Sequence, residues 1–249
     1  MDKEAKLYVL FDMLGDLIRS GPLQWKVDRF RTEDLKDHVF DLILMVKLIR
    51  PHLPSYIDTE KMTDYAIVHD LAEIITGDIT GFEGIPASEK ERVTRLATNY
   101  LIDVYGDLMH VGELLTAYEE KADIEAKVLK FLDSISSSNT FTKYDNEHKI
   151  DMDNPAVIQC LRENPGVLEL RKECSTLKEV FYVWHSRKIK FTEEEIKKYN
   201  ISKEDADRIV LKAKALMASI YEEYAHVDEI IADFPKEAMI YRNVNTIKN

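Results

Sequence analysis

The chain has 249 residues, of which 45% are hydrophobic, and it carries a formal net charge of −12 at pH 7. This acidic balance argues against a nucleic-acid-binding surface, because phosphate backbones are held by clustered Lys and Arg. No apolar stretch approaches the roughly 18–20 residues of a membrane span, and the charged N-terminus lacks a signal-peptide core. The two cysteines, Cys160 and Cys174, fit no zinc-site spacing and suit a reducing compartment. The sequence therefore predicts a cytoplasmic protein that binds neither nucleic acid nor a membrane.

Few helix breakers interrupt the chain, which contains 8 glycines and 7 prolines, and the apolar spacing predicts an all-α fold. The helices expected in the first half share apolar residues at helical spacing and a cap or breaker at one end. They are expected over residues 3–20, ending at "RSGP"; from Thr32 as N-cap to about residue 50, before Pro51; and from Asp58 or Thr59 to about Thr76.

Later helices are expected from Pro86 to Tyr105, from Asp123 through the middle 140s, and at about 165–185, 193–199 and 203–226. Capping boxes at Thr192/Glu195 and Ser202/Asp205 support the last two. The polar stretch 143–155 is the best boundary candidate. It divides the chain into a first domain, residues 1–150, and a helical C-terminal extension, residues 151–249, packed on that domain.

Two of the seven histidines fall on apolar helix faces. His38 is in phase with Leu35, Leu42 and Met45, and His69 is in phase with Met62 and other apolar residues. A single such histidine is more often a core residue hydrogen-bonded to the backbone than a ligand. The other histidines weighed at this point sit among charges or near helix ends, and we interpret them as ordinary: His52, His148, His185 and His226.

An aspartate next to one of these histidines favours a metal site. Asp70 follows His69 in an apolar run, and a buried carboxylate is costly unless it is paired. A bound cation would offset this cost. Asp133 offers a second carboxylate within an almost wholly apolar helix, and Glu73 lies four residues after His69. Two imidazoles and two carboxylates would leave room on a six-coordinate metal for water and a substrate oxygen.

Five segments in order resemble the HD-domain metal-dependent phosphohydrolases, in particular their 5′-deoxynucleotidase branch. "RTEDLKDHV" (31–39) is similar to that branch's Arg-x-Glu-x-x-x-Glu-His segment, with Asp37 in place of Glu. "VHDLAEIITGDI" (68–79) matches its His-Asp-x-x-Glu-x-x-x-Gly-Asp signature. The resemblance continues through "GIPASEKER" (84–92), "LLTAYEE" (114–120) and "EAKVLKFLDSI" (125–135). It covers roughly residues 5–145 and implies an all-α HD-domain helical bundle.

The resemblance implies one divalent metal ion held by His38, His69, Asp70 and Asp133. Mn²⁺ or Co²⁺ is favoured, while Mg²⁺, Fe²⁺, Ni²⁺ and Zn²⁺ are allowed. Glu73 would position the attacking water and act as general base or acid; otherwise it is a solvated carboxylate or a salt-bridge partner. Binuclear relatives need further histidines before the final aspartate, and here only His110 lies in that interval.

The resemblance also implies substrate contacts. A local excess of cations in residues 19–31 suggests a phosphate clamp, with Arg19 and Arg31 favoured over Lys26 and Arg29. Trp25 would pack on the sugar and disfavour a ribose 2′-hydroxyl, or else simply cover the core. Asp78 would contact the 3′-hydroxyl, or else cap the loop.

The favoured activity is removal of the 5′-phosphate from a deoxynucleoside monophosphate, so the partner is a small nucleotide; a homodimer stays open. One alternative is a triphosphohydrolase with the same metal site, and another is an inactive nucleotide-binding regulator. The candidate cations for phosphate binding cluster on one side of the proposed site only, in residues 19–31, which is enough for one phosphate and favours a monophosphate. The segment "HSRKIK" (185–190) could supply more charge if it folded over the site.

Overall fold

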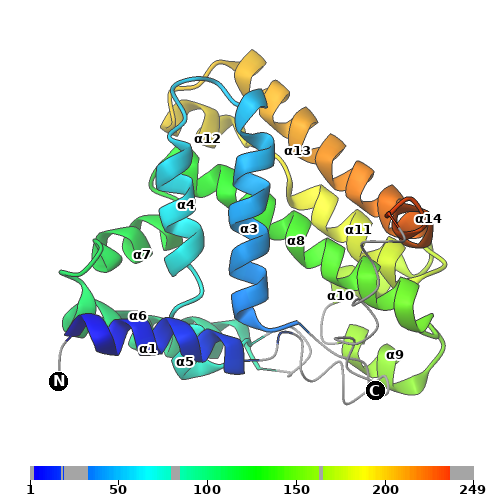
Figure 1. Cartoon of the computed structure of the whole chain (residues 1–249), viewed down its shortest axis with the longest axis horizontal. Helices are drawn as coiled ribbons and strands as arrows, with labels where there is room; N and C mark the ends of the chain where they lie inside the picture. The colour runs from blue at the N-terminus through cyan, green and yellow to red at the C-terminus, as the bar shows by residue number, and fades with distance from the viewer. Residues whose placement is uncertain (1–2, 18, 20–32, 80–84, 163–164, 236–249) are drawn as a thin grey trace.

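The computed structural model describes residues 3–17, 19, 33–79, 85–162 and 165–235. Within these residues every regular element is a helix, which confirms the all-α prediction (Figure 1). None of these helices is long and apolar enough to cross a membrane. The α-helices are α1 (Lys3–Met13), α3 (Leu35–Ile49), α4 (Thr59–Val68), α5 (Glu73–Thr76), α6 (Ala87–Tyr105), α7 (Val111–Glu119), α8 (Ile124–His148), α9 (Pro155–Arg162), α10 (Pro165–Leu170), α11 (Leu177–Lys188), α12 (Glu193–Lys198), α13 (Lys203–Glu223) and α14 (Val227–Ala232). Short 3₁₀ turns span Leu14–Asp16 (η1), Arg50–His52 (η2) and Tyr224–His226 (η3).

Helix α8 is the element on which the other helices assemble. It is 25 residues long, is capped by Asp123 as the sequence predicts, and is buried on most of its surface. It packs against α3 and α4 and also against α11 and α13 (Figure 1). A long helix that is apolar nearly all round is stable only when neighbours cover each face. The position of α8 therefore follows directly from its sequence.

Three hydrophobic clusters fill the interior. One joins α3, α4 and the first half of α8 to α13. A second joins Phe141 and Tyr144, in the last turns of α8, to α9, α10 and α11. A third lies under α1, α6 and α7. Because α8 belongs to two of these clusters, residues on both sides of position 150 share a core. The division into 1–150 and 151–249 stays a prediction.

Two helix starts near the histidines differ from the expected ones. The helix that carries His38 begins at Leu35, and its N-cap is Asp34, whose carboxylate accepts from the Asp37 amide at 2.8 Å. Thr32, the expected cap, lies outside the described residues. The helix expected over 58–76 is interrupted: α4 ends at Val68, and α5 begins at Glu73. Turns with three-residue spacing, such as Leu71 N to Val68 O at 3.0 Å, replace the helical pattern between them.

Other boundaries also changed. The first α-helix ends at Met13 rather than near residue 20, and Leu17 is extended. The segment 165–185 contains two helices, α10 and α11, and α7 and α9 were not expected. The capping box at Thr192/Glu195 is confirmed, whereas Ser202 accepts from the Asp205 amide without the reciprocal bond.

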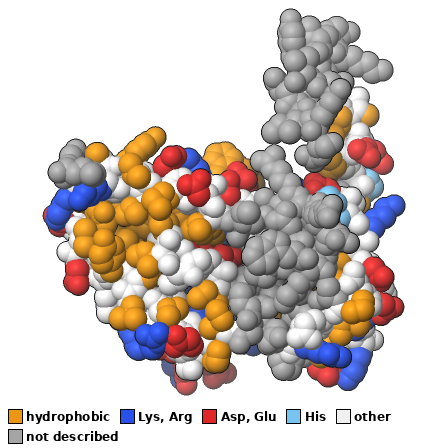
Figure 2. Space-filling model, turned by 90° about the horizontal axis from the view of Figure 1, so that it is seen from below, with side chains coloured by type: hydrophobic (Ala, Val, Ile, Leu, Met, Phe, Trp, Pro, Cys, Tyr) orange, Lys and Arg blue, Asp and Glu red, His pale blue; other side chains and the backbone are white. Residues whose placement is uncertain are grey.

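One face of the molecule carries a concentration of exposed hydrophobic side chains (Figure 2). Exposed large hydrophobic residues of α1 and α6 include Tyr8, Val9, Leu96 and Tyr100. Nothing in the described structure covers them, and the homodimer stays a prediction.

Candidate metal centre

His38 reaches the centre from the first turn of α3. The apolar stripe Leu35, Leu42 and Met45 faces the core, and His38 shares that stripe with no exposed surface. Ahead of α3, the backbone of Leu17 and Arg19 bonds to that of Glu33 and Leu35, through Arg19 N to Glu33 O at 2.9 Å and Leu35 N to Leu17 O at 3.0 Å. This pairing brings Arg19 beside His38.

His69 and Asp70 lie where α4 gives way to the turn before α5. The amide of His69 donates to Tyr65 O at 2.9 Å, as at the end of a helix, and its side chain has no exposed surface. The chain then turns tightly, so Asp70 can face the same point as His69 instead of pointing around a continuing helix. The break that the apolar pattern failed to predict is thus what lets two adjacent residues act together.

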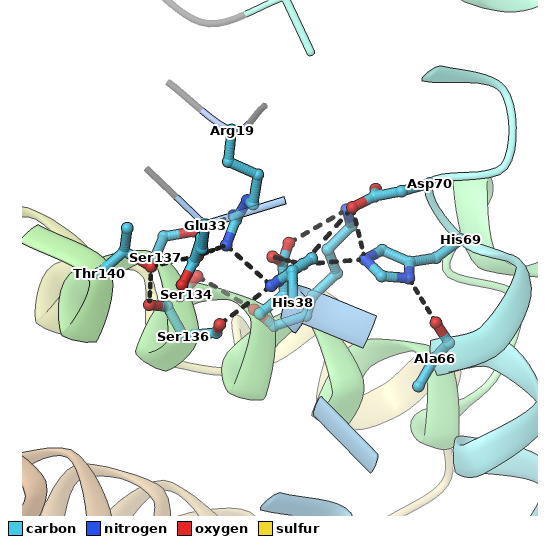
Figure 3. A network of polar contacts seen from close by, with 12 residues as sticks. Arg19, Glu33, His38, Ala66, His69, Asp70, Ser134, Ser136, Ser137 and Thr140 are labelled. Atoms are coloured by element: carbon cyan, nitrogen blue, oxygen red, sulfur yellow. Dashed lines mark hydrogen bonds and ion pairs between the residues drawn. The ribbon is translucent and has the colours of Figure 1, made fainter. Parts of the chain in front are cut away.

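The four residues proposed from the sequence as metal ligands come together, and Figure 3 shows three of them, His38, His69 and Asp70. The Nε2 atoms of His38 and His69 are 3.3 Å apart. Asp70 Oδ2 lies 3.0 Å from His69 Nε2 and 3.4 Å from His38 Nε2. Asp133 Oδ1, from the middle of α8, lies 3.4 Å from His38 Nε2. His38, His69 and Asp133 each offer one ligand atom, and all three atoms lie within 4.8 Å of one another.

The far nitrogen of each imidazole has a polar partner, and the partner of His69 suits metal ligation. His69 Nδ1 lies 2.8 Å from the carbonyl oxygen of Ala66. A carbonyl only accepts, so Nδ1 carries the proton and Nε2 keeps its lone pair. His38 Nδ1 lies 2.9 Å from Ser136 Oγ and 2.8 Å from Arg19 Nη1. Arg19 can only donate, so in this arrangement Nδ1 accepts from it and the proton of His38 lies on Nε2. His38 would bind a cation through Nε2 in the other tautomer, in which Nδ1 donates to Ser136 and Arg19 keeps its bonds to Glu33 and Ser137.

The electrostatics of the four groups are those of a cation site. Burial alone would raise the pKa of Asp70, but the adjacent His69 holds it well below its usual range. Burial opposes ionisation of Asp133 as well, and His38 and Lys130 hold its pKa low. Burial and Arg19 lower the pKa of His38, so this imidazole is neutral. Burial would lower the pKa of His69, but the neighbouring Asp70 raises it above its ordinary value, so without an ion this imidazole favours its charged form. A divalent transition metal takes neutral imidazole and ionised carboxylate ligands, so its binding at these four residues would release the proton of His69.

Glu73 is the first residue of α5 and lies at the edge of the same centre. Its Oε2 is buried and has no hydrogen-bond partner among the described residues. Burial, followed by the charges of Asp70 and Asp78, raises its pKa well above the usual range. A carboxyl group in this state keeps its proton at a higher pH than an exposed glutamate does, which suits a residue that exchanges protons during a reaction.

A cavity of about 320 Å³ opens beside these residues. Four carboxylates line it, namely Asp70, Glu73, Asp78 and Asp133, together with four cations, Arg19, Lys90, Lys130 and Lys188. The expectation that cations lie only on the side of residues 19–31 is therefore wrong, because three of these four come from α6, α8 and α11. The segment 185–190 does reach the site, through His185 and Lys188.

Arg19 joins several elements at the rim of the cavity. Its Nη1 donates to Glu33 Oε1 at 2.8 Å, and its Nη2 donates to Ser137 Oγ at 3.3 Å (Figure 3). Its side chain is 13% exposed. Asp78 also lines the cavity. Trp25 and Arg31, the other two predicted substrate contacts, lie outside the described residues.

His185 was wrongly interpreted as an ordinary surface residue. It is buried, lines the cavity, and its Nδ1 has no hydrogen-bond partner among the described residues. Burial lowers its pKa to about 3, so the imidazole is neutral. His185 lies four residues after Phe181 on α11, a spacing that places both on one helix face and could have indicated burial. The sequence alone did not show that α11 packs on α8. His110, by contrast, is exposed and pairs with Glu113 at 3.4 Å, away from this centre.

Comparison with known proteins identifies the family. A family model described as "HD domain" matches residues 11–174. The chain belongs to the HD-domain family. A human relative, 5′-deoxynucleotidase HDDC2, is 30% identical over 141 residues, which are 55% of this chain and 68% of the relative. The Schizosaccharomyces pombe 5′-deoxynucleotidase hdd1 is 30% identical over 141 residues, 54% of this chain and 69% of the relative.

A solved structure shares the fold of this HD-domain chain. It is described as a "Predicted metal-dependent phosphohydrolase" from Magnetospirillum magnetotacticum and aligns with a TM-score of 0.53 at 16% identity, covering 89% of this chain and 96% of the other. The HD-domain match and the His/Asp cluster together support a divalent metal at this centre. The match ends before α11, which begins at Leu177.

Proposed function

We propose that this HD-domain protein is a metal-dependent 5′-deoxynucleotidase that hydrolyses the 5′-phosphate of deoxynucleoside monophosphates. The observation that carries the proposal is the convergence of two imidazole Nε2 atoms and two ionised carboxylates on one side of a cavity that also holds Glu73. Two relatives at 30% identity are named as 5′-deoxynucleotidases, which supports the same activity.

In this proposal His38, His69, Asp70 and Asp133 hold one divalent ion. When bound, the ion supplies a Lewis acid for the phosphoryl oxygen and makes water a better nucleophile at neutral pH. The protein contributes the second sphere: Ala66 O orients His69, and Ser136 Oγ orients His38. We favour Mn²⁺ or Co²⁺ because the donors are nitrogen and oxygen without sulfur.

Glu73 handles the proton. Its carboxyl lines the cavity, lacks a competing partner among the described side chains and has a raised pKa. In the ionised form it would orient the attacking water and accept its proton. The protonated carboxyl would then return the proton to the leaving 5′-oxygen of the nucleoside.

The charge of the cavity suits a monophosphate. Its lining carries equal numbers of cations and carboxylates, so with Glu73 ionised a divalent ion leaves an excess of two positive charges, and with Glu73 protonated the excess is larger. A phosphate monoester, whose second pKa is about 6, is close to a dianion at neutral pH. A triphosphate would bring roughly four negative charges into the same volume. Arg19 and Lys130 each interact electrostatically with the metal-site carboxylates Asp70 and Asp133.

A second cavity, of about 750 Å³, shares Asp70, Glu73, Lys90 and Lys130 with the first. Its further lining includes Glu91, Glu119 and Glu120 against Arg95 as the one additional cation of its described lining. This excess of carboxylates disfavours an anionic substrate. We therefore assign the nucleotide to the cavity of 320 Å³.

The sugar contacts stay predictions. Asp78 is proposed to accept from the 3′-hydroxyl, Arg31 to bind the phosphate, and Trp25 to close over C2′ of the sugar. If Trp25 does so, dAMP should be hydrolysed faster than AMP, and Trp25→Ala should narrow the difference by admitting the ribose form.

The deciding experiment is a nucleotide screen. The purified protein, freed of metal with a chelator and reloaded with Mn²⁺ or Co²⁺, is offered dAMP, AMP and dATP while released phosphate and triphosphate are measured. We expect metal-dependent release of phosphate from dAMP. Triphosphate release from dATP without dAMP hydrolysis would instead identify a triphosphohydrolase. Tight nucleotide binding without turnover under any metal would identify a regulator.

A further inference from the structure

The cavity beside the metal centre has two chemically different ends. One part of its lining consists of the four carboxylates and the cations Arg19, Lys90 and Lys130. The other is built from aromatic and aliphatic side chains of the last turns of α8, of α10 and of α11: Phe141, Val167, Phe181 and Trp184, with His185 beside them. We call this second end the aromatic wall. A cavity charged at one end and apolar at the other fits a ligand with the same asymmetry.

Within the aromatic wall only Trp184 offers a substantial free surface. Phe141 and Phe181 stack on each other, with ring centroids 3.5 Å apart and an interplanar angle of 4°, and each is 5% exposed. Val167 is 2% exposed. Trp184 is only half-buried and packs with its inner side on the same cluster. Lys188, one turn later on α11, places its Nζ 5.1 Å from the centre of the indole.

The aromatic wall and the metal centre are close enough to influence each other. The charge of Asp133 acts on both His185 and Lys188 of α11, and that of Arg19 acts on His185. His185 is neutral and lacks a partner for Nδ1 among the described residues. The wall therefore presents aromatic side chains and a neutral imidazole to the same cavity as the metal centre, with Lys188 as the one cation beside Trp184 among its described residues.

We propose that the aromatic wall is the nucleobase subsite and that the base of the nucleotide stacks on Trp184. This inference rests on the proposed function, since it takes the phosphate of the same ligand to lie at the metal centre. The extra residues that build it, on α11, lie beyond the part of the chain that matches the HD-domain family model. The C-terminal region thus completes the substrate site rather than merely covering the core.

The test compares dAMP with 2-deoxyribose 5-phosphate, which has the same phosphate and sugar but no base. Loss of one base–aromatic stack weakens binding by about tenfold or more. Trp184→Ala should therefore raise KM for dAMP about tenfold with kcat nearly unchanged, and should leave kcat/KM for 2-deoxyribose 5-phosphate unaltered. Trp184→Phe, which keeps a ring, should recover most of the lost affinity.

Tyr182→Ala is the matched control. Tyr182 is also an aromatic residue of α11, but its ring packs 4.7 Å from that of Tyr221 on α13 and does not line the cavity. It should leave both KM values unchanged. An equal loss with both substrates in Trp184→Ala would contradict the base subsite, because the base-free ester cannot sense a stack.

Fluorescence separates this inference from the activity. The chain has two tryptophans, so Trp25→Phe leaves Trp184 as the single indole. Addition of dAMP should quench its emission, whereas 2-deoxyribose 5-phosphate should not. Phosphate release is measured on the unmodified protein, because Trp25 is itself a proposed sugar contact. Quenching by dAMP in Trp25→Phe without phosphate release by the unmodified protein would support the base subsite and overturn the proposed hydrolysis. Hydrolysis of dAMP without quenching would overturn the base subsite alone.

Discussion

Lys130 lies one helical turn before Asp133 on α8. Its Nζ is 3.6 Å from Asp133 Oδ2 and 4.4 Å from the centre of the Tyr118 ring. Burial disfavours the charged ammonium, but Tyr118 and Asp133 raise its pKa, so Lys130 stays positive beside the proposed metal ligand. It also lines both cavities that meet at the centre. Its charge is therefore placed to attract the phosphate.

Substitution of Lys130 tests this role. Lys130→Met removes one charge from the cavity and should raise KM for dAMP on the order of tenfold, the usual value of a hydrogen bond to a charged group. Lys127→Met is the matched control, because Lys127 lies one turn earlier on α8 and pairs with Glu195 at 2.5 Å, outside the cavity. Steady-state kinetics of both variants decide the question, and equal KM values would exclude Lys130 from phosphate binding.

Metal should stabilise the fold through Asp70. A ligand at about 100 times its Kd adds roughly 2.7 kcal/mol to the free energy of unfolding. Mn²⁺ should thus raise the Tm of the unmodified protein and of Asp64→Ala, whose exposed carboxylate lies on α4. Asp70→Ala should lose both the Tm increase and the metal-dependent turnover. An Asp70→Ala protein with full metal content and activity would refute the ligand assignment.

Glu73→Gln separates proton transfer from metal binding. The amide keeps the shape of the side chain but cannot accept a proton, so kcat should fall by about 10²–10⁴. Metal content, measured by elemental analysis, and the Kd for dAMP should stay close to their original values. Loss of the metal together with the activity would make Glu73 a ligand instead.

The metal-free protein should also reveal Glu73 in its pH dependence. Since the folded-state pKa of Glu73 is raised above its unfolded value, its contribution to stability is fully present at acid pH. That contribution is lost as the pH rises from the unfolded pKa of about 4.3 towards the folded pKa. The Tm of Glu73→Gln minus that of the unmodified protein should therefore grow between pH 4 and neutral pH, in chelator. A Tm difference independent of pH would show that burial does not raise the pKa of Glu73 in the folded protein.

The pair formed by Arg19 and Glu33 predicts an effect on stability that is separate from catalysis. Both side chains are largely buried, at 13% and 7% exposed, and they meet at 2.8 Å. Arg19→Met should lower the free energy of unfolding by about 3–5 kcal/mol, because it leaves the Glu33 charge without its partner. Adding Glu33→Gln should restore part of this loss in urea unfolding.

Lys36→Met provides the comparison for an exposed pair. Lys36 meets Asp12 at 2.8 Å, but both side chains are more than half exposed. Its removal should leave the urea midpoint unchanged. If Arg19→Met behaved like Lys36→Met, the buried pair would contribute nothing to the fold.

Much of the centre could be predicted from sequence because helical phase is a local property. His38 shares a stripe with Leu35 and Leu42, and Asp133 lies within an apolar helix, so each was expected to face the core. Asp58 and Asp123 also cap their helices as expected. These features depend on residues only three or four positions apart.

The remaining features depend on turn geometry or on contacts between segments far apart in sequence, neither of which the helical spacing of apolar residues predicts. The break after Val68 consists of turns with three-residue spacing, and the apolar pattern of residues 66–76 is compatible with either geometry. His185 and Lys188 reach the cavity only because α11 packs along α8, some fifty residues away in sequence. Arg19 reaches His38 through the backbone bonds of Leu17 and Arg19 to Glu33 and Leu35.

The continuity of α8 has a consequence for how the molecule opens. Asp133 lies near the middle of this 25-residue helix, while Phe141 and Tyr144, in its last turns, anchor α9 to α11. A cation held by Asp133 would oppose local unfolding of α8. Local unfolding of the C-terminal helices that pack on α8 would then become coupled to cation binding. Amide hydrogens of α11, far from any ligand atom in sequence, should then exchange more slowly when metal is present. The helix that supplies one carboxylate would thereby couple the C-terminal helices to the cation site.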